Sequence, residues 1–418
     1  MKFFLILLLL VPVTTASDGQ KSEEFCEETK VAKELKKVQA LGETVKGNSE
    51  FAINFFKHVT SMASQGKAST PTNVVFSPLS ISSTFSMLML GSGSKTHQEI
   101  WEGLRLNNTH CEEKEVHRAY SNLLQMLNEP KSSLRVDISN AIFLQDTLTL
   151  LKNFEDSVQD LYHAEIRKTN LTDPQKAKEE INEYVKNKTE GKIEELVKDL
   201  SKDSNMVLIN LVLFKGEWQE PFHPGSTKLE KFIVDKTTTV DVPMMLRLGQ
   251  YNFYRDTKLS CTVVELPYKD SASMIIAIPE PGKIHELEQR LSTETIHRWR
   301  TSFRKGPIEL SLPKFSISST INLEDALHQL GINTAFTNSA DFSGITQDVG
   351  LKLDKAMHRT ILDVDEKGTV AAGATTSEMV PMMLFQRLIF NRPFVLITSD
   401  KNTNSILFMG TVMNPAQK

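Results

Sequence analysis

The sequence predicts a single α+β domain in which helices and strands are mixed along the chain. Segments with strand-like alternation lie between segments with helical spacing, and they form no regular βαβ repeat. No internal repeat, low-complexity segment or linker divides the 418 residues into halves. Three cysteines allow too few disulfides to hold a chain of this length. Stability must therefore come from a large hydrophobic core.

The overall composition argues against several classes of function. The net charge is −4 and 24% of the residues are charged, so whole-protein charge favours neither nucleic acid nor an anionic membrane as a partner. The sequence has no HExxH, GxSxG or Walker motif, and the stretch 91–96 lacks the spacing of a phosphate-binding loop. We expect a protein that is not an enzyme and that needs no metal or other cofactor.

The N-terminal residues predict secretion. Residues 1–16 combine one lysine, an apolar run and small residues before Ala16, which is typical of a signal peptide. The run is shorter than the ~20 residues that a membrane span requires. In a secreted chain, three Asn-x-Thr sequons are candidate glycosylation sites: Asn107, Asn170 and Asn187.

The three cysteines cannot all pair within one chain, so at least one thiol is free or bonded to an external group. They are Cys26, Cys111 and Cys261.

The segment after the signal peptide, residues 17–44, is polar and rich in lysine and glutamate. Apolar residues recur at near-helical spacing, which indicates either a marginal amphipathic helix or a mobile tail outside the main fold. The domain itself is expected to span residues 45–418. We expect its first helix to begin at Asn48–Glu50 and to bury the face that carries Phe51 and Phe55.

Further elements follow in order. Residues 73–81 predict a short strand that turns at Ser77-Pro78 into a helix ending near Leu90. Residues 134–144 alternate like a strand, and residues 174–200 have helical spacing. Residues 206–214 are apolar except for Asn210, which predicts a strand buried on both faces. An unpartnered Asn210 would cost about 1–3 kcal/mol there.

The C-terminal half is rich in strand-like segments. Their expected ranges are 242–245, 261–266, 273–278, 308–317 and 351–365, with a turn at 279–282, a helix at 323–330 and a strongly apolar segment at 388–398. Between residues 351–365 and the apolar segment 388–398, the first half of residues 366–383 is mostly Gly, Ala, Thr and Ser. Such a run is typical of a mobile loop. Its small side chains could also enter a sheet as a strand with little steric cost.

The residues of this loop resemble a known family. Glu366–Ala374, together with Phe390–Phe394 and Phe408–Gly410, is similar to the hinge and C-terminal signature of the serpins, close to the alpha-1-antitrypsin branch. The resemblance covers residues 45–418. It implies one monomeric serpin domain with three β-sheets, eight to nine helices and an exposed reactive-centre loop at about residues 366–387.

The resemblance also implies a function. It implies a secreted serine-protease inhibitor that is attacked as a substrate, forms an acyl-enzyme and inserts its cut loop into the central sheet. Alignment on the hinge places the scissile bond between Met382 and Met383, after Val380 and Pro381. Methionine suits the pockets of elastase- and chymotrypsin-like proteases. The branch has serine after the bond, so Met383 leaves its position open by one residue.

Three groups of residues match functional regions of the family. The hinge comprises Glu366, Lys367, Gly368, Thr369, Val370, Ala371, Ala372, Gly373, Ala374 and Thr375. The shutter beneath the sheet comprises Ser77, Ser80, Asn210 and His358. The breach at the upper end of the sheet comprises Trp218, Lys314 and Glu366. Without the resemblance, Ser77 and Ser80 would be read as helix-capping residues.

Details of the hinge favour an inhibitor. Thr369, Ala371, Gly373 and Thr375 share one face and would turn inward on insertion, and none is charged or bulky. Val370 stands where close relatives usually carry Glu, on the outward face.

Two further expectations complete the interpretation. The alternative is a non-inhibitory serpin that carries a small hydrophobic ligand such as a hormone. We expect no heparin binding, because residues 108–120 carry Glu112, Glu113 and Glu115 against Lys114 and Arg118.

Overall fold

The computed structural model describes residues 18–65, 71–128, 134–348, 350–369 and 386–417, and of residues 18–31 and 369 only the backbone. The signal peptide, hinge residues 370–375, the flank Val380–Pro381 and the expected reactive bond Met382–Met383 lie outside these residues.

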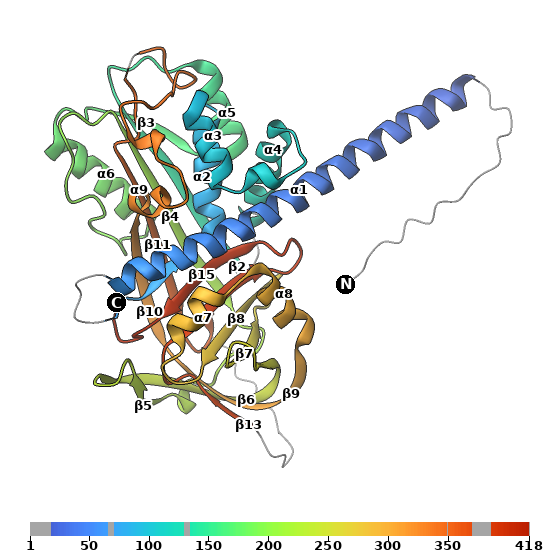
Figure 1. Ribbon diagram of the computed structural model, residues 1–418, viewed down its shortest axis with the longest axis vertical. Coiled ribbons are helices and arrows are strands. Elements are labelled where there is room, and N and C mark those ends of the chain that lie inside the picture. The colour runs from blue at the N-terminus through green and yellow to red at the C-terminus, as the bar shows by residue number, and fades with distance from the viewer. Residues whose placement is uncertain (1–17, 66–70, 129–133, 349, 370–385, 418) are drawn as a thin grey trace.

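The described residues contain nine α-helices, within the range that the serpin resemblance implies, and Figure 1 labels them. They are α1 (Asp18–Gln65), α2 (Pro78–Met89), α3 (Ser94–Gly103), α4 (Glu113–Asn128), α5 (Lys152–Tyr162), α6 (Pro174–Lys188), α7 (Ile284–Arg290), α8 (Thr293–Ser302) and α9 (Leu323–His328). Short 3-10 turns occur at η1 (Leu106–Asn108), η2 (Pro224–Ser226) and η3 (Thr334–Phe336).

A six-stranded sheet holds the segments of greatest interest. Its strand order is β10–β11–β4–β2–β3, and β12 pairs with the end of β4. The bounds are β2 (Leu134–Gln145), β3 (Glu165–Thr169), β4 (Met206–Glu217), β10 (Phe315–Asn322), β11 (Lys355–Val364) and β12 (Gly368–Thr369). β4 and β11 are parallel neighbours although about 140 residues separate them in the chain.

A nine-stranded sheet follows the order β1–β15–β14–β8–β7–β6–β9–β13, with β5 paired to β6. The bounds are β1 (Val74–Phe76), β5 (Lys228–Ile233), β6 (Thr239–Asp256), β7 (Cys261–Pro267), β8 (Ala272–Pro279), β9 (Arg304–Pro313), β13 (Gln386–Ile389), β14 (Phe394–Asp400) and β15 (Ile406–Val412). The serpin resemblance implies three sheets, whereas hydrogen bonds join the described strands into two. β6, 18 residues long, is the reason, because it pairs with β5, β7 and β9 in turn.

Three local predictions differ from the structure. α1 begins at Asp18 and not at Asn48. Asn48 lies inside the helix and does not cap it, because its Oδ1 instead accepts a hydrogen bond from Ser82 Oγ (2.7 Å). α6 ends at Lys188, so residues 189–200 are not helical. The expected strand 308–317 is two strands, since the chain leaves one sheet after Pro313 and enters the other at Phe315.

The core lies on both faces of the six-stranded sheet. Along β4, Leu208, Val212 and Phe214 belong to the main cluster, which includes residues of both sheets. The alternating residues Ile209 and Leu213 pack in a second cluster with α6. The prediction that this strand is buried on both faces is therefore confirmed.

None of the helices in the described residues is both long and apolar enough to cross a membrane. Within the same ranges, no group of three or more His, Cys, Asp or Glu side chains could hold a metal ion.

Candidate functional site

The candidate site is the boundary between β4 and β11, which we call the seam. The two strands pair from Val207↔Lys355 to Phe214↔Leu362. Beyond the last pair the chain turns back, and β12 pairs antiparallel with β4 through Gly368↔Glu217 and Thr369↔Gly216. The first hinge residues therefore lie against β4 where the seam ends.

The turn at the start of the hinge requires glycine at position 368. Asp365 shapes this turn, because its Oδ1 accepts hydrogen bonds from the backbone N–H of Lys367 (2.9 Å) and of Gly368 (3.1 Å). Gly368 has φ 139°, and a Cβ atom there would lie 2.1 Å from the Gly216 carbonyl oxygen. A side chain would therefore push the hinge away from β4.

The three breach residues meet beside this turn. Lys314 Nζ lies 2.8 Å from Glu366 Oε2, and Thr227 Oγ1 donates to Glu366 Oε1 (2.8 Å). Trp218 Nε1 donates to the Asp365 carbonyl (3.0 Å). Burial raises the pKa of Glu366, but the Lys314 and Thr227 hydrogen bonds outweigh it and lower the pKa below its usual value. Glu366 is therefore held as a carboxylate.

The shutter lies deeper along the seam, where polar residues occupy the same register position on three neighbouring strands. Asn210 of β4 pairs with His358 of β11 on one side and with Asn140 of β2 on the other. The side-chain oxygen Oδ1 of Asn210 accepts a hydrogen bond from His358 Nδ1, and its side-chain Nδ2 donates to Asn140 Oδ1. The same amide also bonds Ser80 Oγ (2.6 Å) and Thr84 Oγ1 (3.0 Å) of α2.

The second ring nitrogen of His358 joins the network to α2. His358 Nε2 accepts from the Ser77 backbone N–H (3.1 Å) and from Thr360 Oγ1 (2.7 Å), so Nδ1 is the protonated nitrogen of a neutral ring. Burial lowers the pKa of His358 to about 3, which keeps it neutral. Ser77 Oγ caps α2 by accepting from Ser80 N (3.3 Å), so the capping interpretation holds for Ser77 as well.

The sequence interpretation missed Asn140, Thr84 and Thr360. Asn140 could have been identified from the sequence, because it is an amide residue directly before an apolar run in a strand. Asn210 is also an amide residue within an apolar strand, and both side chains are buried. Thr84 and Thr360 carry no such signal, since threonine is common in helices and strands of any exposure.

The glycosylation candidates and the thiols occupy different environments. Asn107, Asn170 and Asn187 are all exposed, as an acceptor must be. The side chain of Cys26 lies outside the described residues. Among the described side chains, Cys111 is half-buried and Cys261 is buried, and both are free thiols. Burial raises the pKa of Cys261 to about 12, so this thiol stays protonated and unreactive.

The α1–α4 groove bears on the heparin expectation. This groove, of about 350 Å³, has cationic lining residues from both helices: Lys33, Lys36 and Lys37 of α1, and Lys114 and Arg118 of α4. Among the described residues, Glu115 is its one acidic lining residue. The charges of α4 alone therefore understate the positive charge at this face, and the expectation of no heparin binding stays a prediction.

Comparisons with known proteins agree with this geometry. A family model described as Serpin (serine protease inhibitor) matches residues 46–415. An alpha-1-antitrypsin-like protein of Tamias sibiricus is 37% identical over 412 residues, covering 99% of this chain and 98% of the relative. Alpha-1-antiproteinase 2 of Equus caballus is 41% identical over 370 residues, covering 88% of this chain and 86% of the relative.

Solved structures show the same fold. Human thyroxine-binding globulin in complex with its hormone has a TM-score of 0.84 and 37% identity, covering 90% of this chain and 99% of that one. Human glycosylated kallistatin has a TM-score of 0.82 and 37% identity, with the same coverage of 90% and 99%. The chain therefore belongs to the serpin family, whose members are generally protease inhibitors and not enzymes.

Proposed function

We propose that this protein is a secreted, non-enzymatic inhibitor that traps a serine protease as an acyl complex by inserting its reactive-centre loop into the seam. The observation that carries the proposal is the position of β12. Gly368 and Thr369 already pair with β4 at the end of the seam. Insertion would therefore extend a pairing that has begun.

The dimensions of the seam support insertion. The segment from Thr369 to Met382 has about fourteen residues, or about 46 Å as a strand. β4 has 12 residues and β11 has 10, so both can pair along most of that length. A strand that enters between two others adds about one hydrogen bond per residue, for a gain on the order of 10 kcal/mol. That gain is comparable with the whole stability of an ordinary domain.

The proposed target is an elastase- or chymotrypsin-like protease that cuts between Met382 and Met383. An unbranched apolar methionine suits an apolar specificity pocket better than the acidic pocket of trypsin-like enzymes. The proposed active form is a monomer, glycosylated at one or more of its three exposed sequons.

A denaturing gel tests the proposal. The protein is mixed in turn with elastase, chymotrypsin and trypsin, each also with its active-site serine blocked beforehand. We expect a covalent band that survives denaturation with active elastase or chymotrypsin and is absent with the blocked enzymes. Cleavage of the loop by all three enzymes without any such band would rule out trapping.

The alternative function is transport of a small hydrophobic ligand. It is favoured by the likeness to thyroxine-binding globulin, which was solved with its hormone bound. Equilibrium dialysis against labelled thyroxine tests it directly. Saturable binding of thyroxine, together with no covalent protease band, would show that the protein is a carrier and not an inhibitor.

A further inference from the structure

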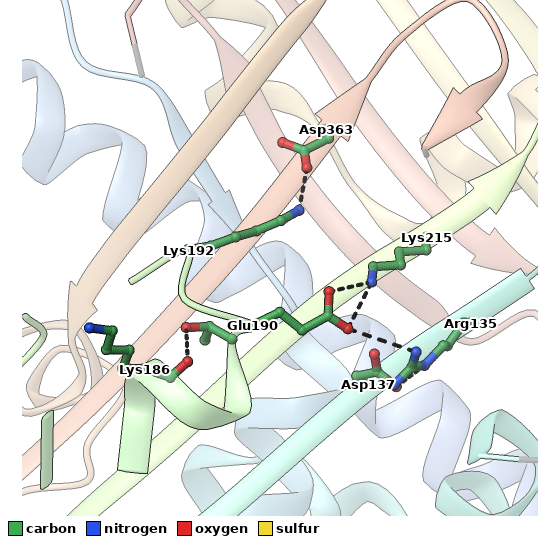
Figure 2. Close-up of polar contacts among 8 residues, drawn as sticks. Arg135, Asp137, Lys186, Glu190, Lys192, Lys215 and Asp363 are labelled. Atoms are coloured by element: carbon green, nitrogen blue, oxygen red, sulfur yellow. Dashed lines mark hydrogen bonds and ion pairs between the residues drawn. The ribbon is translucent and has the colours of Figure 1, made fainter. Parts of the chain in front are cut away.

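Oppositely charged residues flank the end of the seam on the face that α6 covers. Pairing of β4 with β11 stops at Phe214↔Leu362, and the next residues are Lys215 and Asp363. They lie on the α6 side, because Leu213 and Ile361, two positions earlier on each strand, belong to the cluster under α6. Figure 2 shows both side chains reaching toward the turn that follows α6.

This turn makes ion pairs with strands on both sides of the seam (Figure 2). Glu190 bonds Lys215 Nζ of β4 through both carboxylate oxygens (3.0 and 2.8 Å), and its Oε1 lies 3.9 Å from Arg135 Nη1 of β2. Two residues later, Lys192 Nζ lies 2.7 Å from Asp363 Oδ2 of β11. One short segment thus holds β4 and β11 together from outside.

The turn has little freedom to follow a moving strand. Glu190 and Gly191 both have positive φ (53° and 78°), and Gly191 N donates to the Lys186 carbonyl (2.8 Å), which ends α6 with a tight cap. Ile193 is buried in the apolar cluster between α6 and the sheet. The backbone positions of residues 190 and 192 are therefore held at a nearly constant separation.

We propose that the pairs Glu190–Lys215 and Lys192–Asp363 form a latch that keeps the seam closed and limits the rate at which a strand can enter it. The inference rests on the proposed function, because it takes the seam as the place of insertion. A new strand moves β4 and β11 apart by about 4.8 Å. Pairs of 2.7–3.0 Å that start from one rigid turn cannot both persist through that movement. At least one pair must break before a strand enters.

The chain offers a matched control at the end of α6, just before the turn that carries the latch. Lys188 Nζ pairs with Glu165 Oε1 of β3 at 2.7 Å, and both side chains are about as exposed as those of the latch. β3 lies beyond β2, so this pair does not cross the seam. Loss of the Lys188 pair loosens α6 from the sheet without opening the latch.

The test measures uptake of a synthetic peptide with the sequence of residues 369–382, without any protease. Uptake is followed as the rate at which the full-length protein forms a peptide complex that is stable on a native gel. We expect Glu190→Gln and Lys192→Gln each to accelerate uptake roughly two- to fivefold, the range for partly exposed ion pairs. Lys188→Gln should leave the rate unchanged, and high salt should reduce the differences.

A charge exchange separates the latch from general loosening. Lys192→Asp places two carboxylates together and should accelerate uptake further, whereas Lys192→Asp combined with Asp363→Lys should return it toward the wild-type rate. Equal rates in wild type and the Gln variants, or acceleration by Lys188→Gln, would overturn the latch. A wild-type protein that takes up no peptide would instead count against the seam as the place of insertion, and so against the proposed function.

Discussion

His358 links the pairing of β4 with β11 to the protonation state of one buried ring. Its two nitrogens connect β11 with Asn210 of β4 and with Ser77 at the start of α2. Burial lowers its pKa from 6.5 to about 3. The neutral ring is thus the form that holds this network together, and protonation would leave Nε2 facing the Ser77 N–H as a second donor.

A pH dependence follows from this depressed pKa. The unfolded chain binds a proton on His358 below its ordinary pKa of 6.5, whereas the folded protein does so only near pH 3. The neutral His358 side chain therefore makes its full contribution to the stability of the folded protein above pH 6.5. As the pH falls from 6.5 toward 3, the free energy of unfolding decreases, by about 2 kcal/mol at pH ~5. Urea denaturation at several pH values measures it. In His358→Gln, whose side chain does not titrate, the free energy of unfolding should depend much less on pH. An unchanged pH dependence in that variant would contradict the role of His358.

Asn210 provides a second residue-scale prediction. Asn210→Ala leaves the partners of its amide unsatisfied and should destabilise the protein by about 1–3 kcal/mol. Because its partners join β2, β4 and β11, we expect polymers on a native gel after mild heating. Asn73→Ala is the control, since Asn73 is also buried and bonds Met413 N and Asn414 N away from the seam. Equal polymer formation by both variants would show that the shutter has no special role.

The reactive bond is tested by changing its specificity. Met382→Arg should move inhibition from elastase- or chymotrypsin-like enzymes to trypsin-like ones, because arginine fits an acidic pocket. The measurement is the second-order inhibition rate with each enzyme. Met383→Arg is the matched variant, and if it alone redirected inhibition, the bond would lie one residue further on.

At the scale of elements, β12 and the hinge determine whether the loop can enter the seam. Thr369→Arg would place a charged side chain inside the sheet on insertion, where an unpaired charge costs several kcal/mol. The exposed loop should still be cut, so the variant should be a substrate that releases active protease. Val370→Arg, on the alternate outward face, should continue to trap protease. Equal trapping by both variants would mean that the loop does not insert as a strand.

Local sequence signals predicted most elements but not all of their ends. The alternation of β2, the buried run of β4 and the Ser77-Pro78 start of α2 are local patterns, and all three were confirmed. The helix start at Asn48 was wrong, because a good capping residue is not a cap when the preceding residues are helical too. The predicted strand 308–317 included Lys314, whereas the structure has two strands there, one on each side of Lys314 and in different sheets. The alternation of residues within 308–317 does not show that the chain changes sheet.

At the scale of the whole molecule, the uncleaved fold is expected to be less stable than the cleaved one. Cleavage within residues 370–385 frees the loop to enter the seam, for a gain on the order of 10 kcal/mol in hydrogen bonds. The cleaved protein should therefore unfold at a much higher temperature, which calorimetry measures. Cleaved Thr369→Arg is the control and should gain much less. Equal unfolding temperatures before and after cleavage of the wild type would contradict loop insertion.

The sequence by itself determined the α+β class, the buried strand with its central asparagine, and the small-residue hinge. These are properties of neighbouring residues, and their periodicity and size can be read without knowing what lies across from them. The grouping of Asn210, His358, Ser77 and Ser80 came from resemblance and not from spacing.

Tertiary structure alone decided which distant residues meet. Asn140 and Thr84 join Asn210, and Glu190 and Lys192 reach across the seam to Lys215 and Asp363. No local pattern marks these partners, because the parallel pairing of β4 with β11 joins segments about 140 residues apart. The strength of a polar contact depends on burial and geometry at the meeting point, and the fold sets both.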